Sequence, residues 1–312
     1  TGLEFAAYRL AGGGLDRLGS GAAPVCPCRP TSARAGFRVT LGAMKPAQLM
    51  PAQEIEQWVA RIVRDDVQAL QPYAVSESAG MVKLDAMENP HALPQPLRAE
   101  LGAIASTIAL NRYPDAGAHE LKAAVRRYMQ VPATLEIVLG NGSDEIIQML
   151  ALGCARPGTC ILGVEPSFAM FPLIARVCGL QFVGVPLARD FALDAEAVIA
   201  AMKQHRPGLV FLAYPNNPTG NLFDAAAIER VVREAPGLVV IDEAYHPFAQ
   251  ASFMARLHDF PNLVLMRTLS KLGLAGLRLG MLVGSPYWTT QFEELRLPYN
   301  VNALSQVGAK RV

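Results

Sequence analysis

From residue 83 onward, short apolar runs alternate with segments of helical length, and this alternation is the feature that most constrains the fold. The apolar runs are predicted strands, at residues 136–139, 159–164, 181–185, 209–213, 238–241, 263–266 and 280–283. Predicted helices lie between them, at residues 118–129, 144–154, 194–203 and 224–234. Strands separated by helices form a mainly parallel sheet with both faces covered. We therefore expect an α/β fold whose ligands bind at the carboxyl ends of the strands.

Composition narrows the class of partner. The 28 Lys and Arg residues nearly cancel the 27 Asp and Glu residues, so no charge excess favours nucleic acid. Every apolar run is shorter than the roughly 20 residues of a membrane-spanning helix. We expect a cytoplasmic protein with a small-molecule partner, without nucleic acid, membrane or metal. The scattered cysteines are expected to be structural thiols: Cys26, Cys28, Cys154, Cys160 and Cys178.

Residues 1–43 are rich in Gly, Ala and Arg and show no helical or strand periodicity. They are expected to be a disordered leader or a non-native extension, and a targeting peptide is the alternative. Met44 is then the expected natural first residue. An amphipathic helix is predicted after it, because Ile55, Val59 and Ile62 are spaced for one apolar face.

The run from Gly140 to Glu145 follows one predicted strand and opens a helix. Small residues there expose backbone N–H groups, and the helix dipole favours negative charge at this end. The run predicts a phosphate site, although Ser143 or Asp144 acting only as a helix cap explains it equally well.

Two further runs come directly after predicted strands. Residues 214–220 read Tyr-Pro-Asn-Asn-Pro-Thr-Gly and fix an unusual backbone path, with an ordinary turn as the alternative. Asp242 ends a strand that is expected to be buried, where an unpaired carboxylate is costly. Its partner is either a protonated heteroaromatic nitrogen or, in the structural alternative, an arginine. Glu243 is expected to point elsewhere and is given no role.

The most specific run spans residues 268–280, with the sequence TLSKLGLAGLRLG. It places Lys271 and Arg278 among apolar residues and glycines, directly after a predicted strand. A lysine in such surroundings has a lowered pKa, and its neutral amine attacks aldehydes. Ser270 and Arg278 suit phosphate oxygens, because hydroxyl and guanidinium groups both donate to them.

In this order, the four runs resemble those of the fold type I pyridoxal phosphate aminotransferases. Four further sequence motifs resemble the histidinol-phosphate aminotransferase branch, at residues 66–73, 87–90, 111–115 and 297–302. Threonine-phosphate decarboxylases and some aromatic aminotransferases share much of these motifs. The resemblance implies a mainly parallel central sheet sandwiched by helices, with a second, smaller domain that is only partly present.

The resemblance also implies roles for individual residues. Lys271, Asp242 and Tyr245 are the expected catalytic residues: Lys271 binds the cofactor as a Schiff base and moves the substrate proton, and Asp242 keeps the pyridine nitrogen protonated. Asn217 and Tyr245 would hydrogen-bond the ring hydroxyl, and Phe168 would stack on the ring, where the family often has Tyr. The remaining cofactor contacts are expected to be phosphate ligands: Gly142, Ser143, Asp144, Ser270 and Arg278, with Tyr113 reaching the phosphate of a partner subunit.

The implied reaction transfers an amino group between L-histidinol phosphate and 2-oxoglutarate in histidine biosynthesis, in a homodimer. The expected domains are the leader (1–43), an arm with a helix (44–80), a large cofactor-binding domain (81–297) and the start of a small domain (298–312). Its continuation, with a substrate-binding arginine, is expected beyond residue 312. A non-catalytic cofactor-sensing domain is the alternative outside enzymes, and it predicts a helix-turn-helix segment that residues 1–43 lack.

Overall fold

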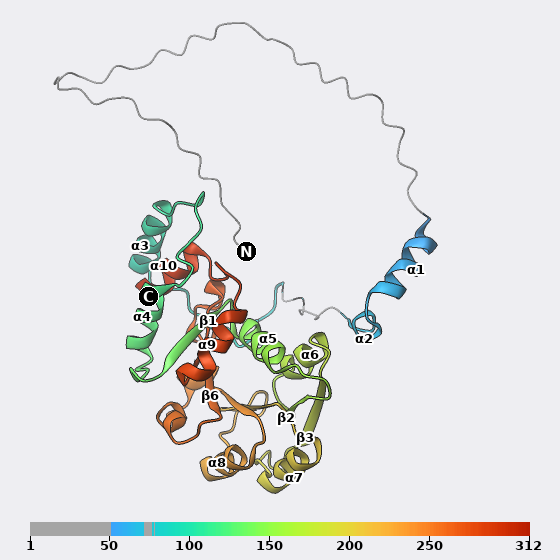
Figure 1. Ribbon diagram of the computed structural model, residues 1–312. Helices are drawn as coiled ribbons and strands as arrows, with labels where there is room; N and C mark the ends of the chain where they lie inside the picture. Colours follow the sequence, from blue (N-terminus) through green and yellow to red (C-terminus); the bar gives the residue numbers. More distant parts are fainter. Residues whose placement is uncertain (1–50, 72–76, 78) are drawn as a thin grey trace, which may run out of the picture. The chain divides into compact units, whose positions relative to one another are not determined.

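The computed structural model describes residues 51–71, 77 and 79–312, and the structural statements below concern that part of the chain (Figure 1). The predicted leader, Met44, Cys26, Cys28 and Tyr73 lie outside the described residues. The first described element, α1 (Ala52–Ile62), is the predicted amphipathic helix. None of its residues is buried.

Seven strands form one sheet in the order β1-β7-β6-β5-β4-β2-β3. Their bounds are β1 Glu136–Gly140, β2 Cys160–Glu165, β3 Gln181–Pro186, β4 Leu209–Ala213, β5 Leu238–Asp242, β6 Leu263–Thr268 and β7 Gly280–Gly284. Neighbouring strands from β6 to β3 pair in parallel, whereas β7 runs antiparallel to both β1 and β6. The predicted mainly parallel sheet is confirmed, and β7 is its one antiparallel strand among the described residues.

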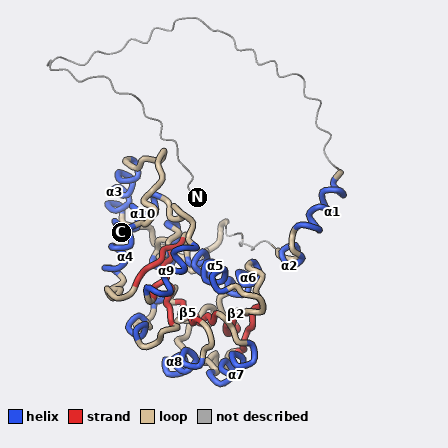
Figure 2. Tube along the Cα trace, in the orientation of Figure 1, coloured by secondary structure: helices blue, strands red, loops and turns tan. Residues whose placement is uncertain are grey.

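Helices cover both faces of the sheet (Figure 2). The remaining α-helices are α2 Asp65–Gln68, α3 Gln95–Ser106, α4 His119–Tyr128, α5 Ser143–Cys154, α6 Met170–Val177, α7 Ala195–His205, α8 Ala225–Glu234, α9 Pro286–Leu295 and α10 Ala303–Arg311. Short 3-10 helices follow β5 and β6: η1 His246–Phe248, η2 Met254–His258, η3 Ser270–Leu272 and η4 Ala275–Leu277. None of the described helices is long and apolar enough to cross a membrane.

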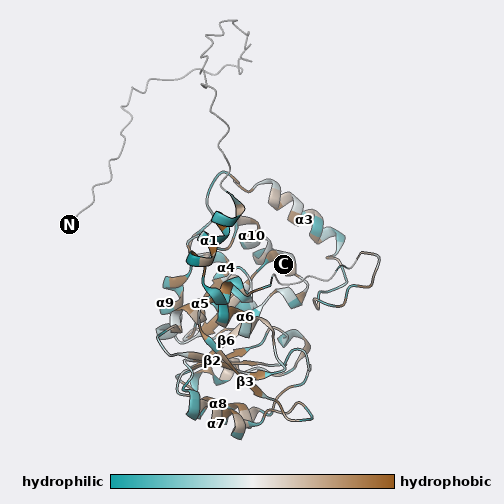
Figure 3. Cartoon of the chain, turned by 90° about the vertical axis from the view of Figure 1, so that its right-hand side faces the viewer, coloured by the Kyte–Doolittle hydropathy of each residue, from teal (hydrophilic) through white to brown (hydrophobic). Residues whose placement is uncertain are grey.

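Side-chain alternation along the strands divides the core into two layers. In β5, Val239 and Ile241 belong to the core layer that holds residues of α4, α7 and α8, whereas Leu238 and Val240 belong to the layer that holds residues of α5, α6 and α9. The other buried strands alternate in the same way, because successive strand residues point to opposite faces. Figure 3 shows apolar colouring on strands such as β2 and β3. The face of α5 and α6 is therefore also the face toward which Asp242 points.

The predicted strands and helices all occur, with bounds that differ by at most two residues. Sequence reasoning did not identify α2, α3, α6, α9 and α10. The predicted limits of the arm, large domain and small domain stay predictions, although α10 packs on α3 and α4.

Candidate active site

A cavity of about 470 Å³ opens at the carboxyl ends of β4, β5 and β6. All the sequence-predicted site residues line it except Gly142 and Tyr113. Its lining consists of Ala86, Glu88, Ser143, Asp144, Phe168, Ala213, Asn217, Asp242, Ala244, Tyr245, Thr268, Ser270, Lys271, Ala275 and Arg278. Residues as far apart in the chain as Ser143 and Arg278 meet here because parallel strands end at the same edge of the sheet. This edge is where the sequence predicted a ligand.

At one end of the cavity, the turn between β1 and α5 forms a cradle for an anion. Gly142 precedes the helix with a φ of +90°, in the left-handed region that favours glycine. A Cβ atom at Gly142 would lie 2.5 Å from Nη2 of Arg278, so a larger residue there would displace the guanidinium. Arg278 Nη2 also lies 3.8 Å from the Asp144 carboxylate. Helix N–H groups and a guanidinium thus face one small space, as a phosphate requires.

Asp242 lies at the cavity floor with only 4% of its surface exposed. Burial raises the pKa of this carboxyl to about 7, although the backbone N–H of Ala244 donates to Oδ1 at 2.9 Å. Within the described residues no arginine or lysine forms an ion pair with it, so the structural alternative of an arginine partner is not realised. A buried acid without a cation at its side is suited to a ligand that brings a protonated nitrogen.

Asp242→Asn is therefore expected to stabilise the cofactor-free chain. Because the folded-state pKa is raised, the wild type loses stability as pH rises from 3.8 to about 7, whereas the amide cannot ionise. The stability difference between variant and wild type should grow over that range to a few kcal/mol, on the order of 1.4 kcal/mol per pKa unit. Urea unfolding across pH measures it.

The matched control for that prediction is Asp194→Asn. Asp194 is exposed and caps α7 by accepting from the N–H of Ala197, a role that asparagine fills equally well. This variant should unfold with nearly the wild-type free energy at neutral pH, because the cap is kept. If the difference in unfolding free energy between Asp242→Asn and the wild type did not grow between pH 3.8 and about 7, the Asp242 carboxyl would not be held neutral by burial.

Lys271 lies in η3, the 3-10 turn that follows β6, and is half-buried beside the same cavity. Burial lowers the pKa of its ammonium group, while the charges of Glu88 and Asp144 oppose that shift. Nζ donates to the carbonyl of Ala86 at 2.7 Å and lies 5.4 Å from the centre of the Tyr245 ring. A more easily deprotonated amine is a better nucleophile toward aldehydes.

Side chains from three loops surround the middle of the cavity, between the anion cradle and Asp242. Asn217 Nδ2 lies 3.4 Å from the hydroxyl of Tyr245, so an oxygen in the cavity could contact both. Phe168 is held edge-on against Phe171, with ring centres 5.5 Å apart. Burial raises the pKa of Tyr245, so its hydroxyl remains a donor.

Three structural contributors near the site escaped the sequence prediction. Asn216 is buried and joins two loops, because Ser167 Oγ donates to its Oδ1 and its Nδ2 donates to the carbonyl of Pro166. Thr268 accepts a hydrogen bond from the N–H of Ser270 and so shapes the start of η3, the lysine turn that contains Lys271. The sequence did contain signals for both residues: Asn216 stands next to Asn217, and Thr268 carries a hydroxyl two residues before Ser270. The third contributor is Glu243, for which no role was expected.

Glu243 is 1% exposed and points away from the cavity, as expected, but it forms a buried ion pair. Nε and Nη2 of Arg267 donate to its Oε2 at 2.9 Å and 2.8 Å. Ser252 Oγ and the N–H of Phe253 donate to the same carboxylate. Glu243 therefore has a structural contact, and its lack of a role in the cavity chemistry stays a prediction. Each partner directly adjoins a cavity residue in sequence, Asp242 or Thr268, and the pair joins β5 to β6 on the opposite face.

Tyr113 lies outside the cavity and is 79% exposed. Its ring stacks on Tyr299, with centroids 4.4 Å apart. Its predicted contact with a second subunit stays a prediction. The described residues also contain no group of three side chains suited to a metal ion.

Comparison with known proteins identifies the family. Residues 79–312 match the family described as aminotransferase class I and II. The chain is 57% identical over 256 residues to histidinol-phosphate aminotransferase 2 of Cupriavidus pinatubonensis, covering 80% of this chain and 70% of that protein. It is 53% identical over 260 residues to histidinol-phosphate aminotransferase 1 of Ralstonia nicotianae, covering 82% of this chain and 70% of that protein.

A solved structure gives the same result. Histidinol-phosphate aminotransferase from Sinorhizobium meliloti, in complex with pyridoxal-5'-phosphate, superposes with a TM-score of 0.70 at 26% identity. The match covers 79% of this chain and 69% of that one. These matches also establish that the chain has fold type I and that it belongs to an enzyme family rather than to the sensing domains. By sequence and by fold, this chain belongs to the class I and II aminotransferases and, among them, to the histidinol-phosphate aminotransferase family.

Proposed function

We propose that this chain uses pyridoxal 5'-phosphate to transfer an amino group between L-histidinol phosphate and 2-oxoglutarate, a step of L-histidine biosynthesis. The observation that carries the proposal is the convergence, in one cavity of about 470 Å³, of an anion cradle, a buried acid and a half-buried lysine. The relatives with 53–57% identity supply the substrate, because they are named for it. The cavity fits this cofactor, which carries a phosphate, a pyridine nitrogen and an aldehyde.

The phosphate would be held at the N-terminus of α5. The N–H groups of Gly142, Ser143 and Asp144 would donate to it, together with Ser270 Oγ and Arg278. Support comes from the left-handed Gly142 and the guanidinium packed directly against it. Because phosphate carries charge, these donors would contribute more than neutral hydrogen bonds do.

The pyridine ring withdraws the electrons left at the substrate α-carbon when that carbon loses its proton. Asp242 would hold a proton on the ring nitrogen, which keeps this withdrawal strong. Asn217 and Tyr245 would hydrogen-bond the ring hydroxyl, and Phe168 would pack on the ring face. The raised pKa of Asp242 supports this role, because a positive charge brought to the buried carboxyl would relieve the cost of ionising it.

Lys271 would have two tasks. Its Nζ would hold the cofactor covalently before substrate arrives, and once released it would move the proton at the substrate α-carbon. Both tasks require a neutral amine for part of the time, and burial favours that form by lowering the pKa. A base performs best when its pKa lies near the working pH.

We also propose a homodimer in the cytoplasm. Tyr113 is expected to contact the cofactor phosphate of a partner subunit, and its exposure on the surface leaves it available to do so. The described cysteines, Cys154, Cys160 and Cys178, form no disulfide with one another, which is usual for a protein of the reducing cytosol.

The test is a spectral titration of the purified chain with pyridoxal phosphate, followed by different amino donors. A visible band should form on loading, and L-histidinol phosphate should convert it with a kcat/KM at least about tenfold higher than an aromatic amino acid or threonine phosphate gives. Preference for an aromatic amino acid would support a different aminotransferase. Release of carbon dioxide from threonine phosphate would indicate the decarboxylase, and no band at all would refute the cofactor site.

A further inference from the structure

Asn300, in the segment between α9 and α10, bridges the two sides of the turn that forms the anion cradle. Its Nδ2 donates to the carbonyl of Leu139 at 3.2 Å and to Oε2 of Glu145 at 2.7 Å. Leu139 precedes the turn in β1, and Glu145 follows it in the first helical turn of α5. The same Glu145 oxygen accepts from the N–H of Asn141, inside the turn. One amide thus fixes the spacing between the entry and the exit of the turn.

The contacts of Asn300 require an amide rather than a carboxylate. Nη1 of Arg296 donates to its Oδ1 at 2.9 Å, and a guanidinium cannot accept, so the atom facing Arg296 is the oxygen. The opposite atom faces Glu145 and the Leu139 carbonyl, which are acceptors, so it must be a donor. Aspartate has nearly the same shape but would place an oxygen against both acceptors.

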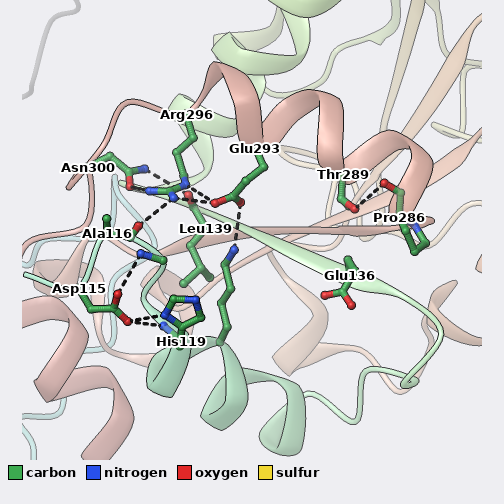
Figure 4. A network of polar contacts seen from close by, with 12 residues as sticks. Asp115, Ala116, His119, Glu136, Leu139, Pro286, Thr289, Glu293, Arg296 and Asn300 are labelled. Atoms are coloured by element: carbon green, nitrogen blue, oxygen red, sulfur yellow. Dashed lines mark hydrogen bonds and ion pairs between the residues drawn. The ribbon is translucent and has the colours of Figure 1, made fainter. Parts of the chain in front are cut away.

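Arg296 is itself held firmly, as Figure 4 shows. Its Nε and Nη2 donate to Glu293, and Nη2 also donates to the carbonyl of Ala116 at 2.8 Å. Lys122 on α4 donates to the same Glu293 carboxylate at 3.0 Å. The amide of Asn300 therefore rests on a support that is tied to α4, α9 and the 115–117 loop.

The turn itself has little freedom once its ends are set. A Cβ atom at Gly280 would lie 2.5 Å from the carbonyl carbon of Gly142, so β7 lies directly against the turn. Arg278 closes the other side of Gly142. We expect a shift at Leu139 or Glu145 to reach the N–H groups of residues 142–144, because β7 leaves the turn little room to move.

We propose that Asn300 is a positioning residue for the phosphate-binding turn, acting through Leu139 and Glu145 on the donors at residues 142–144. The inference rests on the proposed function, since it assumes that this turn holds the cofactor phosphate. It assigns to a residue more than 150 positions away in the sequence the task of shaping that site.

The test compares two ligands that differ only in the phosphate, pyridoxal phosphate and pyridoxal, on wild type and on Asn300→Asp. The variant should bind pyridoxal phosphate about 10- to 100-fold more weakly, since a hydrogen bond to a charged group becomes a repulsion. Its affinity for pyridoxal should not change. The lost preference for the phosphate should return as pH falls, because protonation of the new carboxyl restores the missing donor.

Asn302→Asp is the matched control. Asn302 caps α10 by accepting from the N–H of Ser305, and aspartate serves there equally well. It should keep the wild-type ratio of the two affinities at every pH. Thermal unfolding without ligand reports whether either variant is merely less stable. If Asn300→Asp does not fold, Asn300→Ala carries the same comparison, with a smaller loss that does not depend on pH.

The outcomes separate the two proposals. A wild type that prefers pyridoxal phosphate, together with an Asn300 variant that has lost this preference, supports the positioning role. A variant that keeps the wild-type preference overturns it, while the phosphate site itself stands. A wild type with no preference for the phosphate refutes the phosphate site of the proposed function, and the role of Asn300 falls with it.

Discussion

Lys271→Ala is expected to abolish covalent capture of pyridoxal phosphate and to lower the transamination rate by at least about 10³-fold, because one side chain supplies both the nucleophile and the base. The cradle, Asp242 and Phe168 remain in place, so the variant should still bind the cofactor without a covalent bond. Reduction with borohydride followed by mass measurement detects the covalent attachment in wild type, and stopped-flow absorbance with L-histidinol phosphate measures the rate.

Lys203→Ala is the matched control, because Lys203 is an exposed lysine near the end of α7 that does not line the cavity. It should keep the wild-type rate and the covalent attachment. If Lys271→Ala retained either property, another amine would have to be the one that binds the cofactor. The assignment of the lysine would then be wrong, even though the family and the fold would stand.

Most of the fold could be predicted because its signals are local. An apolar run of five or six residues followed by a helical pattern predicts a buried strand, and the repetition of that unit predicts a parallel sheet. The edge at which the site forms follows from the topology, since parallel strands end together. Asp242, Asn217 and Lys271 each come soon after such a strand, and the structure brings all three to one cavity.

The parts that escaped prediction depend on contacts between distant residues. The ion pair of Glu243 and Arg267 joins two strands, and nothing in either strand alone indicates the partner. Asn300 contacts Glu145 across more than 150 residues. The direction of β7 escaped as well, because its apolar run is the same in either orientation. These features depend on the order of the strands in the sheet. Local patterns in one sequence do not show that order.

Asp242 and Glu243 illustrate the difference between a local sequence pattern and a contact between distant residues. Neighbours in a strand point to opposite faces, so one carboxylate is available to the cavity and the other must find a partner in the opposite layer. That partner, Arg267, precedes Thr268 and the lysine turn. The ion pair thus sets the relative position of the strand ends that carry Asp242 and Lys271, without contacting the cavity face itself.

Arg267→Met is therefore expected to cost about 3–5 kcal/mol of unfolding free energy, because it leaves the Glu243 carboxylate buried without its cation. Burial already raises the pKa of Glu243, and the charge of Arg267 opposes that shift. Removing the arginine raises this pKa further, so the variant should lose stability as pH rises and regain it as pH falls. Guanidinium unfolding at several pH values measures the effect.

Two comparisons distinguish this explanation from a simple loss of packing. The double variant Glu243→Leu/Arg267→Met removes both charges and should be more stable than Arg267→Met alone, since no buried charge is left unpaired. Arg230→Met breaks an exposed ion pair with Glu196 on the surface and should cost no more than about 1 kcal/mol. If Arg267→Met instead proved as mild as Arg230→Met, or if the double variant were the less stable of the two, the buried pair would not be what holds the ends of β5 and β6 together.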